Sequence, residues 1–209
     1  MADTLAIMKM SPVIPVVTIH SVDEAIAMAR DLYDGGLKTI EITRRTQVAL
    51  DAVRAIADAV PDLCLGVGTV WTASQAREAL AAGAQFIVSP GIADEVGEVC
   101  READLPYLPG AQTVSEVAYL VRQGYQQVKL FPASVIGGPS AIKAYAAVFP
   151  DVQFCPTGGI TEQSAPDYLK LRSIPCVGGS WLAKPAKGDE PDGQSPTRAA
   201  AERAAGLGG

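Results

Sequence analysis

Two short apolar runs flank an amphipathic stretch in residues 13–42, VIPVVTIHSVDEAIAMARDLYDGGLKTIEI. The runs Val13–Val17 and Thr39–Ile42 are rich in β-branched residues and predict strands. Between them, Ser21 and the glutamate three residues later form a capping-box pattern ahead of a helix over Ala25–Tyr33, which a glycine pair ends. The segment therefore predicts a strand–helix–strand unit, a connection typical of parallel strands.

The same alternation continues along most of the chain and makes eight strand–helix pairs. It predicts a parallel sheet covered by helices, either open or closed into a barrel. Eight units favour the barrel, and the lack of a GxGxxG motif after the first strand argues against a dinucleotide-binding open sheet. We therefore predict an α/β protein with a single (β/α)8, or TIM, barrel. The remaining predicted strands are residues 63–68, 86–89, 107–108, 127–131, 153–156 and 176–178.

The composition changes near the end of the chain. The segment Lys184–Thr197 is rich in Pro, Gly, Asp and Lys, which predicts a loop, and Arg198–Ala205 predicts a short Ala-rich helix. We expect a barrel catalytic domain over residues 1–183. Residues 184–209 are expected to form a polar linker and a short C-terminal helix that belong to the same domain.

The overall composition limits location and partners. Although 48% of the 209 residues are hydrophobic, no apolar run approaches the roughly 18 residues that a membrane span needs. The formal net charge of −6 argues against a nucleic-acid or anionic-membrane surface. Residues 1–4 lack the basic start of a secretory signal, so we expect a cytoplasmic protein with no nucleic acid or membrane as partner.

Cysteine and histidine usage bears on metal chemistry. The four cysteines are far apart and lack CxxC spacing, so they predict reduced, mostly buried thiols and neither a zinc site nor a redox pair. His20 is the single histidine and precedes a predicted helix, where a solvated turn residue is typical. We therefore expect no metal, and acid–base chemistry must come mainly from carboxylates, lysine, tyrosine, hydroxyls or water. The cysteines are Cys64, Cys100, Cys155 and Cys176.

Two charged residues lie inside predicted strands that should be almost entirely apolar. Glu41 lies between Ile40 and Ile42, and Lys129 likewise lies between two aliphatic residues. Since side chains alternate along a strand, each charge faces away from its aliphatic neighbours. If those neighbours face the helices, Glu41 and Lys129 point into the barrel near its C-terminal mouth, where barrel enzymes place their chemistry.

Two interpretations of this pair are open at this point. The purely structural one is a buried Glu41–Lys129 ion pair, although such pairs cost desolvation and often add no net stability. The functional one is that burial disfavours the ammonium form of Lys129 and so exposes a nucleophilic amine for a carbonyl substrate.

Two glycine loops predict an anion site. Pro156-Thr-Gly-Gly-Ile160 and Val177-Gly-Gly-Ser-Trp181 follow the last two predicted strands, where this fold commonly binds phosphate. Their glycines let backbone N–H groups approach an oxyanion, and a following helix N-terminus adds a favourable dipole. Arg45, just past Glu41, can present a planar fork to a carboxylate or phosphate, and Gly66-Val-Gly-Thr69 adds a hydroxyl.

At these residues the chain resembles the 2-keto-3-deoxy-6-phosphogluconate (KDPG) aldolases, which are grouped with the 4-hydroxy-2-oxoglutarate (KHG) aldolases. The similarity runs from Pro12 to Trp181 and is specific because several short motifs occur together. The segments that carry it are Glu41-Ile-Thr-Arg-Arg-Thr46, Gly66-Val-Gly-Thr-Val70, Ser89-Pro-Gly91, Lys129-Leu-Phe-Pro-Ala133 and Cys155-Pro-Thr-Gly-Gly-Ile160.

The resemblance implies a class I aldolase that reversibly cleaves KDPG into pyruvate and glyceraldehyde 3-phosphate, in the Entner–Doudoroff pathway. It implies that Lys129 forms an imine with the substrate ketone and that Glu41 moves protons through a water. Arg45 and Thr69 would hold the pyruvate end, and Phe131 would pack against the bound intermediate. The remaining substrate-binding positions are Pro90 and the phosphate-binding Thr157, Gly158, Gly159, Gly179 and Ser180.

The resemblance further implies a homotrimer that needs no metal or cofactor, because the protonated imine is itself the electron sink. Two positions depart from the familiar pattern: Ser134 stands where relatives often carry an acidic residue, and Arg44 stands where they carry an aliphatic one. Alternative substrates with the same chemistry are the phosphogalactonate epimer of KDPG and unphosphorylated KHG. From other classes, a sugar-phosphate isomerase or epimerase and a non-catalytic sugar-phosphate sensor are the competing hypotheses.

Overall fold

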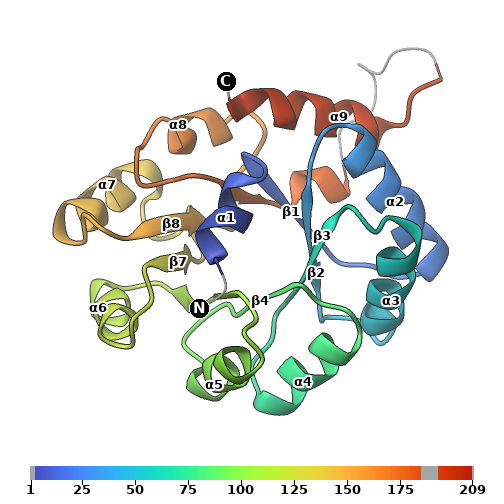
Figure 1. Cartoon of the computed structure of the whole chain (residues 1–209). Coiled ribbons are helices and arrows are strands. Elements are labelled where there is room, and N and C mark those ends of the chain that lie inside the picture. Colours follow the sequence, from blue (N-terminus) through green and yellow to red (C-terminus); the bar gives the residue numbers. More distant parts are fainter. Residues whose placement is uncertain (1–2, 185–192, 209) are drawn as a thin grey trace.

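The computed structural model describes residues 3–184 and 193–208, and its strands form a ring that helices surround (Figure 1). None of the described helices is long and apolar enough to span a membrane. The strands are β1 (Val13–Val17), β2 (Thr39–Thr43), β3 (Cys64–Gly68), β4 (Phe86–Val88), β5 (Tyr107–Leu108), β6 (Gly110–Ala111), β7 (Gln127–Leu130), β8 (Gln153–Pro156) and β9 (Val177–Gly179). The helices are α1 (Thr4–Lys9), α2 (Val22–Asp34), α3 (Ala49–Ala59), α4 (Ala73–Ala81), α5 (Asp94–Glu102), α6 (Val114–Arg122), α7 (Gly138–Val148), α8 (Ala165–Leu169), η1 (Trp181–Ala183), α9 (Pro196–Ala205) and η2 (Gly206–Gly208).

The ring closes through two irregular junctions. The hydrogen-bonded strand orders are β5-β4-β3-β2-β1-β9 and β6-β7-β8, and these pairings are parallel. Pro109, which has no N–H, separates β5 from β6, so one barrel strand pairs with β4 through its first half and with β7 through its second. On the other side, a parallel bridge between Thr157 and Gly178 joins β8 to β9. The predicted α/β barrel is confirmed.

Local signals in the sequence place most element boundaries to within a residue or two. The hydroxyl of Ser21 accepts a hydrogen bond from the N–H of Glu24 at 3.2 Å and so caps α2, which begins at Val22, three residues before the predicted Ala25. Gly36 takes a φ of +96°, which ends that helix. The predicted strand at 107–108 is incomplete, because the chain resumes pairing after Pro109, and the last strand begins at Val177 and not at 176.

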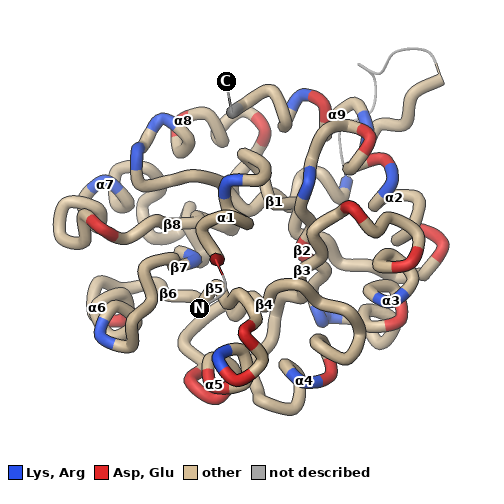
Figure 2. Tube along the Cα trace, in the orientation of Figure 1, with Lys and Arg blue, Asp and Glu red and all other residues tan. Residues whose placement is uncertain are grey.

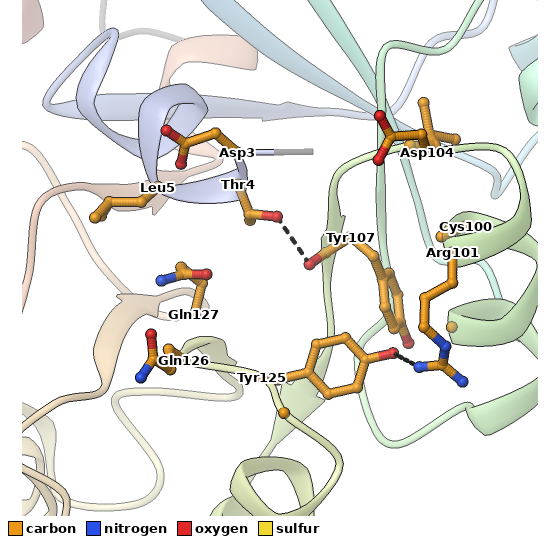
Figure 3. Close-up of a pocket in the computed structure, with 13 residues that line it drawn as sticks. Asp3, Thr4, Leu5, Cys100, Arg101, Asp104, Tyr107, Tyr125, Gln126 and Gln127 are labelled. Carbon is orange, nitrogen blue, oxygen red and sulfur yellow. Dashed lines mark hydrogen bonds between the residues drawn. The ribbon is translucent and has the colours of Figure 1, made fainter. Parts of the chain in front are cut away.

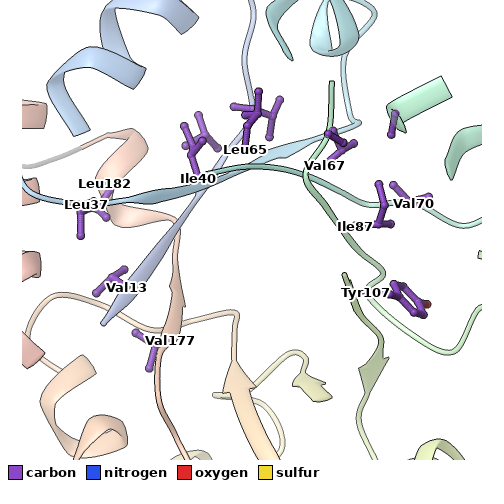
Figure 4. Packing of buried hydrophobic residues seen from close by; sticks show 14 of the residues in the cluster. Val13, Leu37, Ile40, Leu65, Val67, Val70, Ile87, Tyr107, Val177 and Leu182 are labelled. Atoms are coloured by element: carbon purple, nitrogen blue, oxygen red, sulfur yellow. The ribbon is translucent and has the colours of Figure 1, made fainter. Parts of the chain in front are cut away.

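The core has one part outside the ring and one part inside it. Between strands and helices, aliphatic side chains at alternate strand positions, such as Ile40, Leu65 and Val67, are buried (Figure 4). Each such side chain stabilises the fold by about 1.5–3 kcal/mol. The charged residues lie mostly on the surrounding helices (Figure 2).

Inside the ring, a second apolar cluster fills the amino-terminal end of the barrel, and we call this cluster the apolar end. Helix α1 lies across the centre of the ring in Figure 1, and its Ile7 and Met8 are buried in this cluster. Asp3 begins the helix by accepting from the N–H of Ala6 at 2.9 Å. This helix was not predicted from the sequence. The members of the apolar end are Ile7, Met8, Ile14, Phe86, Val88, Leu108, Cys155 and Cys176.

The C-terminal helix α9 packs against α2. A Cβ atom at Gly35 would lie 2.5 Å from the Cβ of Ala201, so the two helices approach closely at a residue without a side chain. The hydroxyl of Ser195 also donates to the carboxylate of Asp31 at 2.6 Å. The helix predicted near this end is therefore present and joined to the barrel by packing and hydrogen bonding.

The start of α9 corrects the sequence prediction. The helix begins at Pro196 and not at Arg198, because Ser195 accepts from the N–H of Arg198 and proline is favoured in the first turn. The predicted loop is therefore two residues too long at its end. Residues 185–192 of that loop lie outside the described residues, and the division of the chain at residue 183 stays a prediction.

Candidate active site

The two charges predicted inside the barrel meet there. The Nζ atom of Lys129 donates to both carboxylate oxygens of Glu41, at 3.2 and 3.3 Å. Only 4% of Lys129 and 3% of Glu41 is exposed, while their aliphatic neighbours Ile40 and Leu130 belong to the helix-facing core. Both side chains therefore lie on the face of their strands that side-chain alternation predicts.

A glycine on the neighbouring strand makes room for this ion pair. A Cβ atom at Gly68 would lie 1.9 Å from a carboxylate oxygen of Glu41, so a side chain there would displace the carboxylate from its present position. On the other side, Nζ of Lys129 lies 5.7 Å from the centroid of the Phe131 ring. This part of the barrel interior, which we call the polar end, holds Glu41, Lys129 and the hydrogen-bonded hydroxyls of Thr18 and Thr43.

Four of the predicted substrate-binding residues line one cavity of about 360 Å³. Arg45 is exposed, and no ion pair joins it to any residue within the described ranges. An unpaired guanidinium in a cavity is suited to an anionic group. The four residues are Arg45, Thr69, Pro90 and Phe131.

Thr69 has an unusual backbone conformation where it enters this cavity. Its φ is +63°, a region that a β-branched residue rarely adopts. The residue follows Gly68 at the end of β3, so the turn that leaves space for Glu41 also brings Thr69 to the cavity. Such strain is common at functional sites and persists only where the surrounding structure enforces it.

The predicted phosphate residues meet at the ends of β8 and β9. Gly158 and Gly159 have φ values of +96° and +73°, which only glycine adopts readily. The hydroxyl of Thr157 fills the space that a Cβ atom would take at Gly178, on the next strand. Ser180 is exposed and its hydroxyl caps no helix. These residues do not line the 360 Å³ cavity, so the structure places them in a separate group.

The two groups are joined by the segment after β7. The N–H of Ala133 donates to the carbonyl of Thr157 at 2.8 Å, and the N–H of Ser134 donates to that of Gly158 at 3.1 Å. A Cβ atom at Gly158 would lie 3.1 Å from the ring of Phe131, a residue that also lines the cavity. The peptide bond between Phe131 and Pro132 is cis. The cavity and the glycine loops therefore share one wall.

Sequence reasoning missed three polar or aromatic residues of the cavity, namely Trp71, Gln112 and Glu116. Partial burial opposes ionisation of Glu116, but hydrogen bonds from the backbone N–H groups of Gln112 and Thr113 and from the Thr113 hydroxyl lower the pKa of its carboxyl. The capping-box pattern at Thr113 and Glu116 signals a helix start and carries no information about a cavity.

One buried thiol lies beside the ion pair and contacts a second buried thiol. Cys155 is the register partner of Lys129, and its Sγ atom lies 3.7 Å from that of Cys176. The hydrogen bond to Cys155, together with burial, raises the pKa of the Cys176 thiol well above its ordinary value. All four cysteines are free and three are buried, as predicted, although sequence spacing did not predict that these two meet.

A larger cavity of about 460 Å³ lies at the opposite end of the barrel, between α1 and α5 (Figure 3). Tyr107 and Tyr125 form an edge-to-face pair there, and Arg101 donates to the Tyr125 hydroxyl at 2.8 Å. None of the predicted site residues lines this cavity. The chemistry-bearing side chains gather instead at the carboxyl ends of the strands, which is typical of TIM-barrel enzymes.

Comparison with known proteins identifies the family within that class. Residues 5–195 match the model of the KDPG and KHG aldolases. The KHG/KDPG aldolase of Escherichia coli K12 is 43% identical over 177 residues, covering 85% of this chain and 83% of the relative.

Solved structures agree. The crystal structure of the 2-keto-3-deoxy-6-phosphogluconate aldolase of Zymomonas mobilis ZM4 with 3-phosphoglycerate is 40% identical, with a TM-score of 0.90 and coverage of 98% of this chain and 96% of that one. The KDPG aldolase of Legionella pneumophila, with pyruvate captured at low pH as a covalent carbinolamine intermediate, is 37% identical, with a TM-score of 0.90 and 98% coverage of both chains. The chain belongs to the KDPG and KHG aldolase family. It is accordingly an aldolase, a carbon–carbon lyase.

Proposed function

We propose that this protein is a class I aldolase that reversibly cleaves KDPG into pyruvate and glyceraldehyde 3-phosphate, with Lys129 as the amine nucleophile. The observation that carries the proposal is the buried lysine, whose Nζ atom lies 3.2 Å from the carboxylate of Glu41. The covalent carbinolamine of pyruvate in the Legionella relative supports an amine nucleophile in this family. No metal or cofactor takes part in the proposed reaction.

In the proposed mechanism, Glu41 takes a proton from the Lys129 ammonium, and the free amine attacks the ketone carbon of the substrate. Glu41 returns this proton to the carbinolamine hydroxyl, which leaves as water to give a protonated imine, and Glu41 is again a carboxylate. Glu41, through a water, then removes the proton of the C4 hydroxyl. The C3–C4 bond breaks, its electron pair enters the iminium to form an enamine, and glyceraldehyde 3-phosphate leaves. Protonation of the enamine at C3 and hydrolysis of the imine release pyruvate and restore the amine.

The binding residues divide the substrate into two ends in this proposal. Arg45 and Thr69 hold the carboxylate of the pyruvate end, Phe131 packs against the imine, and Pro90 completes the wall. The phosphate lies at the other end, against the backbone of the two glycine loops. The 3-phosphoglycerate in the Zymomonas relative supports a phosphorylated ligand. The loop residues proposed for the phosphate are Thr157, Gly158, Gly159, Gly179 and Ser180.

The second candidate substrate is KHG, because the matching family model and the Escherichia coli relative are both named for KHG as well as KDPG. The phosphogalactonate epimer is a third candidate, because Ser134 replaces the acidic residue that relatives often carry beside the substrate. Ser134 lies against Gly159 of the proposed phosphate loop, where a Cβ atom would approach the Ser134 hydroxyl to 1.9 Å. Kinetic comparison of the three substrates separates them, and KDPG is expected to be cleaved most efficiently. The family assignment disfavours a sugar-phosphate isomerase or epimerase.

We further propose that the enzyme acts as a cytoplasmic homotrimer in the Entner–Doudoroff pathway. These proposals rest on the family resemblance. The four free cysteines fit a reducing compartment.

The decisive experiment is borohydride reduction in the presence of pyruvate, followed by intact-protein mass measurement and peptide mapping. One covalent label on Lys129 is expected, since the reduced imine is a stable amine. Lys129→Arg should abolish labelling, because a guanidinium stays protonated and cannot form an imine. Lys143→Arg, at an exposed position on α7, is the matched control and should be labelled like the wild type. A label on another lysine, or none, would refute the mechanism.

A further inference from the structure

Trp71 is a large aromatic residue with no role in the reaction described above. It follows the strained Thr69 by two positions and lines the same cavity as Arg45. The residue is 49% exposed, so much of its surface is open to the cavity and to solvent.

Hydrogen bonds at the start of α4 hold the backbone from which this side chain projects. The N–H of Trp71 donates to the side-chain oxygen of Gln75 at 2.7 Å, and the next residue, Thr72, caps α4. A Cβ atom at Gly91 would lie 3.9 Å from the indole Cζ3 atom, so the ring lies over a stretch of backbone that has no side chain. The backbone of Trp71 is therefore held in place, and its ring forms part of the cavity wall beside Gly91.

Arg45 needs such a wall if it is to bind a carboxylate well. It is exposed, and an ion pair in open water contributes only about 0–1 kcal/mol and is weakened by salt. The same pair becomes stronger where an apolar group keeps water away from it.

We propose that Trp71 is a specificity-determining residue, because its ring covers the ion pair between Arg45 and the substrate carboxylate and excludes water from it. The inference rests on the proposed function and adds a residue to the keto-acid end of the site. The C1 carboxylate is the end of a 2-keto acid, so the indole selects against substrates with a larger polar group in its place, which would be desolvated against an apolar ring without a partner. Lys129 and Glu41 lie inside the barrel, so the chemical step itself does not depend on the ring.

The test uses Trp71→Ala and Trp71→Phe in the full chain, with KDPG as substrate and sodium chloride as the variable. Trp71→Ala should raise KM about tenfold and leave kcat within about twofold, since it removes shielding of a bound charge and no reacting group. Its KM should also rise more steeply with salt than that of the wild type, because counterions reach the exposed ion pair. Trp71→Phe, which retains an aromatic ring, should keep both KM and the salt dependence of KM close to those of the wild type.

Two further measurements make the result specific. Val114→Ala, at an exposed position on α6 that does not line the cavity, is the matched control and should change neither KM nor its salt dependence. Pyruvate should also alter the tryptophan fluorescence of the wild type, and this change should disappear in Trp71→Phe, which retains the second tryptophan, Trp181.

The outcomes separate this inference from the proposed function. If borohydride and pyruvate do not label the wild type, the proposed function fails and this inference fails with it. If the wild type is labelled but Trp71→Ala keeps the wild-type KM and salt dependence, only the role of Trp71 is overturned. A change of assembly state in Trp71→Ala without a steeper salt dependence would also overturn it, because the ring would then serve a contact between subunits.

Discussion

The two ends of the barrel interior differ in chemistry and take most of their side chains from different strands. At the apolar end, helix α1 inserts Ile7 and Met8 among aliphatic, aromatic and thiol side chains. At the polar end, the strands carry Glu41 and Lys129, and a glycine on β3 leaves the space that the carboxylate occupies.

Because of this difference, the apolar end mainly stabilises the fold, whereas the polar end holds the residues proposed for the chemistry. Burial of apolar side chains at one end stabilises the folded state, and it does not require a partner group at a defined distance or angle. The buried ion pair at the other end contributes little net stability, because desolvation opposes the attraction between its charges. A fold stable by about 5–15 kcal/mol can keep such a pair only if the rest of the core is well packed. The apolar end and the helix-facing core provide that packing.

The largest expected effect concerns Glu41→Gln. If Glu41 moves protons, kcat should fall by roughly 10²- to 10⁴-fold, the usual contribution of a general acid–base group. Pyruvate should still become attached to Lys129 under borohydride, though slowly. Steady-state kinetics and thermal unfolding on one preparation are the required measurements.

The purely structural interpretation of the same pair makes the opposite prediction. Removing one partner of a buried ion pair should destabilise the fold by about 3–5 kcal/mol. A Glu41→Gln protein that unfolds much earlier, yet retains near-normal turnover per folded molecule, would assign Glu41 to structure. Glu24→Gln, at an exposed position on α2, is the control for loss of a carboxylate.

An intermediate effect is expected at the apolar end. Met8 is fully buried, so Met8→Ala should lower the free energy of unfolding by about 2–5 kcal/mol. Turnover per folded molecule should stay near that of the wild type, because Met8 belongs to the apolar cluster and neither ion-pair residue is a member of it. Denaturant unfolding measures the free energy of unfolding. Labelling with pyruvate counts the active sites, so that turnover can be expressed per folded molecule.

Met10→Ala is the matched control, since Met10 is the same residue type on the same segment and is 46% exposed. It should change stability by less than about 0.5 kcal/mol. A loss of turnover in Met8→Ala that persists after normalisation would show that the two ends are coupled, and the separation argued above would be wrong.

The smallest expected effect is that of a chelator. Within residues 3–184 and 193–208, no three His, Cys, Asp or Glu side chains are grouped as the ligands of a metal ion would be. Dialysis against a strong chelator should therefore leave kcat and KM unchanged. Activity that is lost on dialysis and returns with added zinc or magnesium would contradict the proposal that the protonated imine alone accepts the electron pair.

Much of the candidate site could be predicted because its signals are local. A charge between two aliphatic residues on a strand is conspicuous, and side-chain alternation then gives its direction, as for Glu41 and Lys129. The glycine loops after the last strands were recognisable for a similar reason. The roles of these residues in catalysis and binding stay predictions until the variants are measured.

Other features could not be predicted because they depend on distant parts of the chain. Helix α1 has six residues, too few to show a clear helical period, and it is stabilised by tertiary burial. Trp71 and Glu116 enter the same cavity from different strand–helix units. Cys155 and Cys176 are 21 residues apart, without any spacing motif, and meet only because β8 and β9 are neighbours.

The sequence by itself determined the α/β class, the barrel and the faces on which Glu41 and Lys129 lie, because periodicity and turn residues act over a few positions. Only the tertiary structure decided which groups come into contact. Closure of the ring places β2 and β7 across the barrel interior from each other, so that two residues 88 positions apart form one buried ion pair. It also sets Arg45, Thr69 and Trp71 around one cavity. Contact of this kind depends on the packing of whole strands and helices, and no local pattern encodes it.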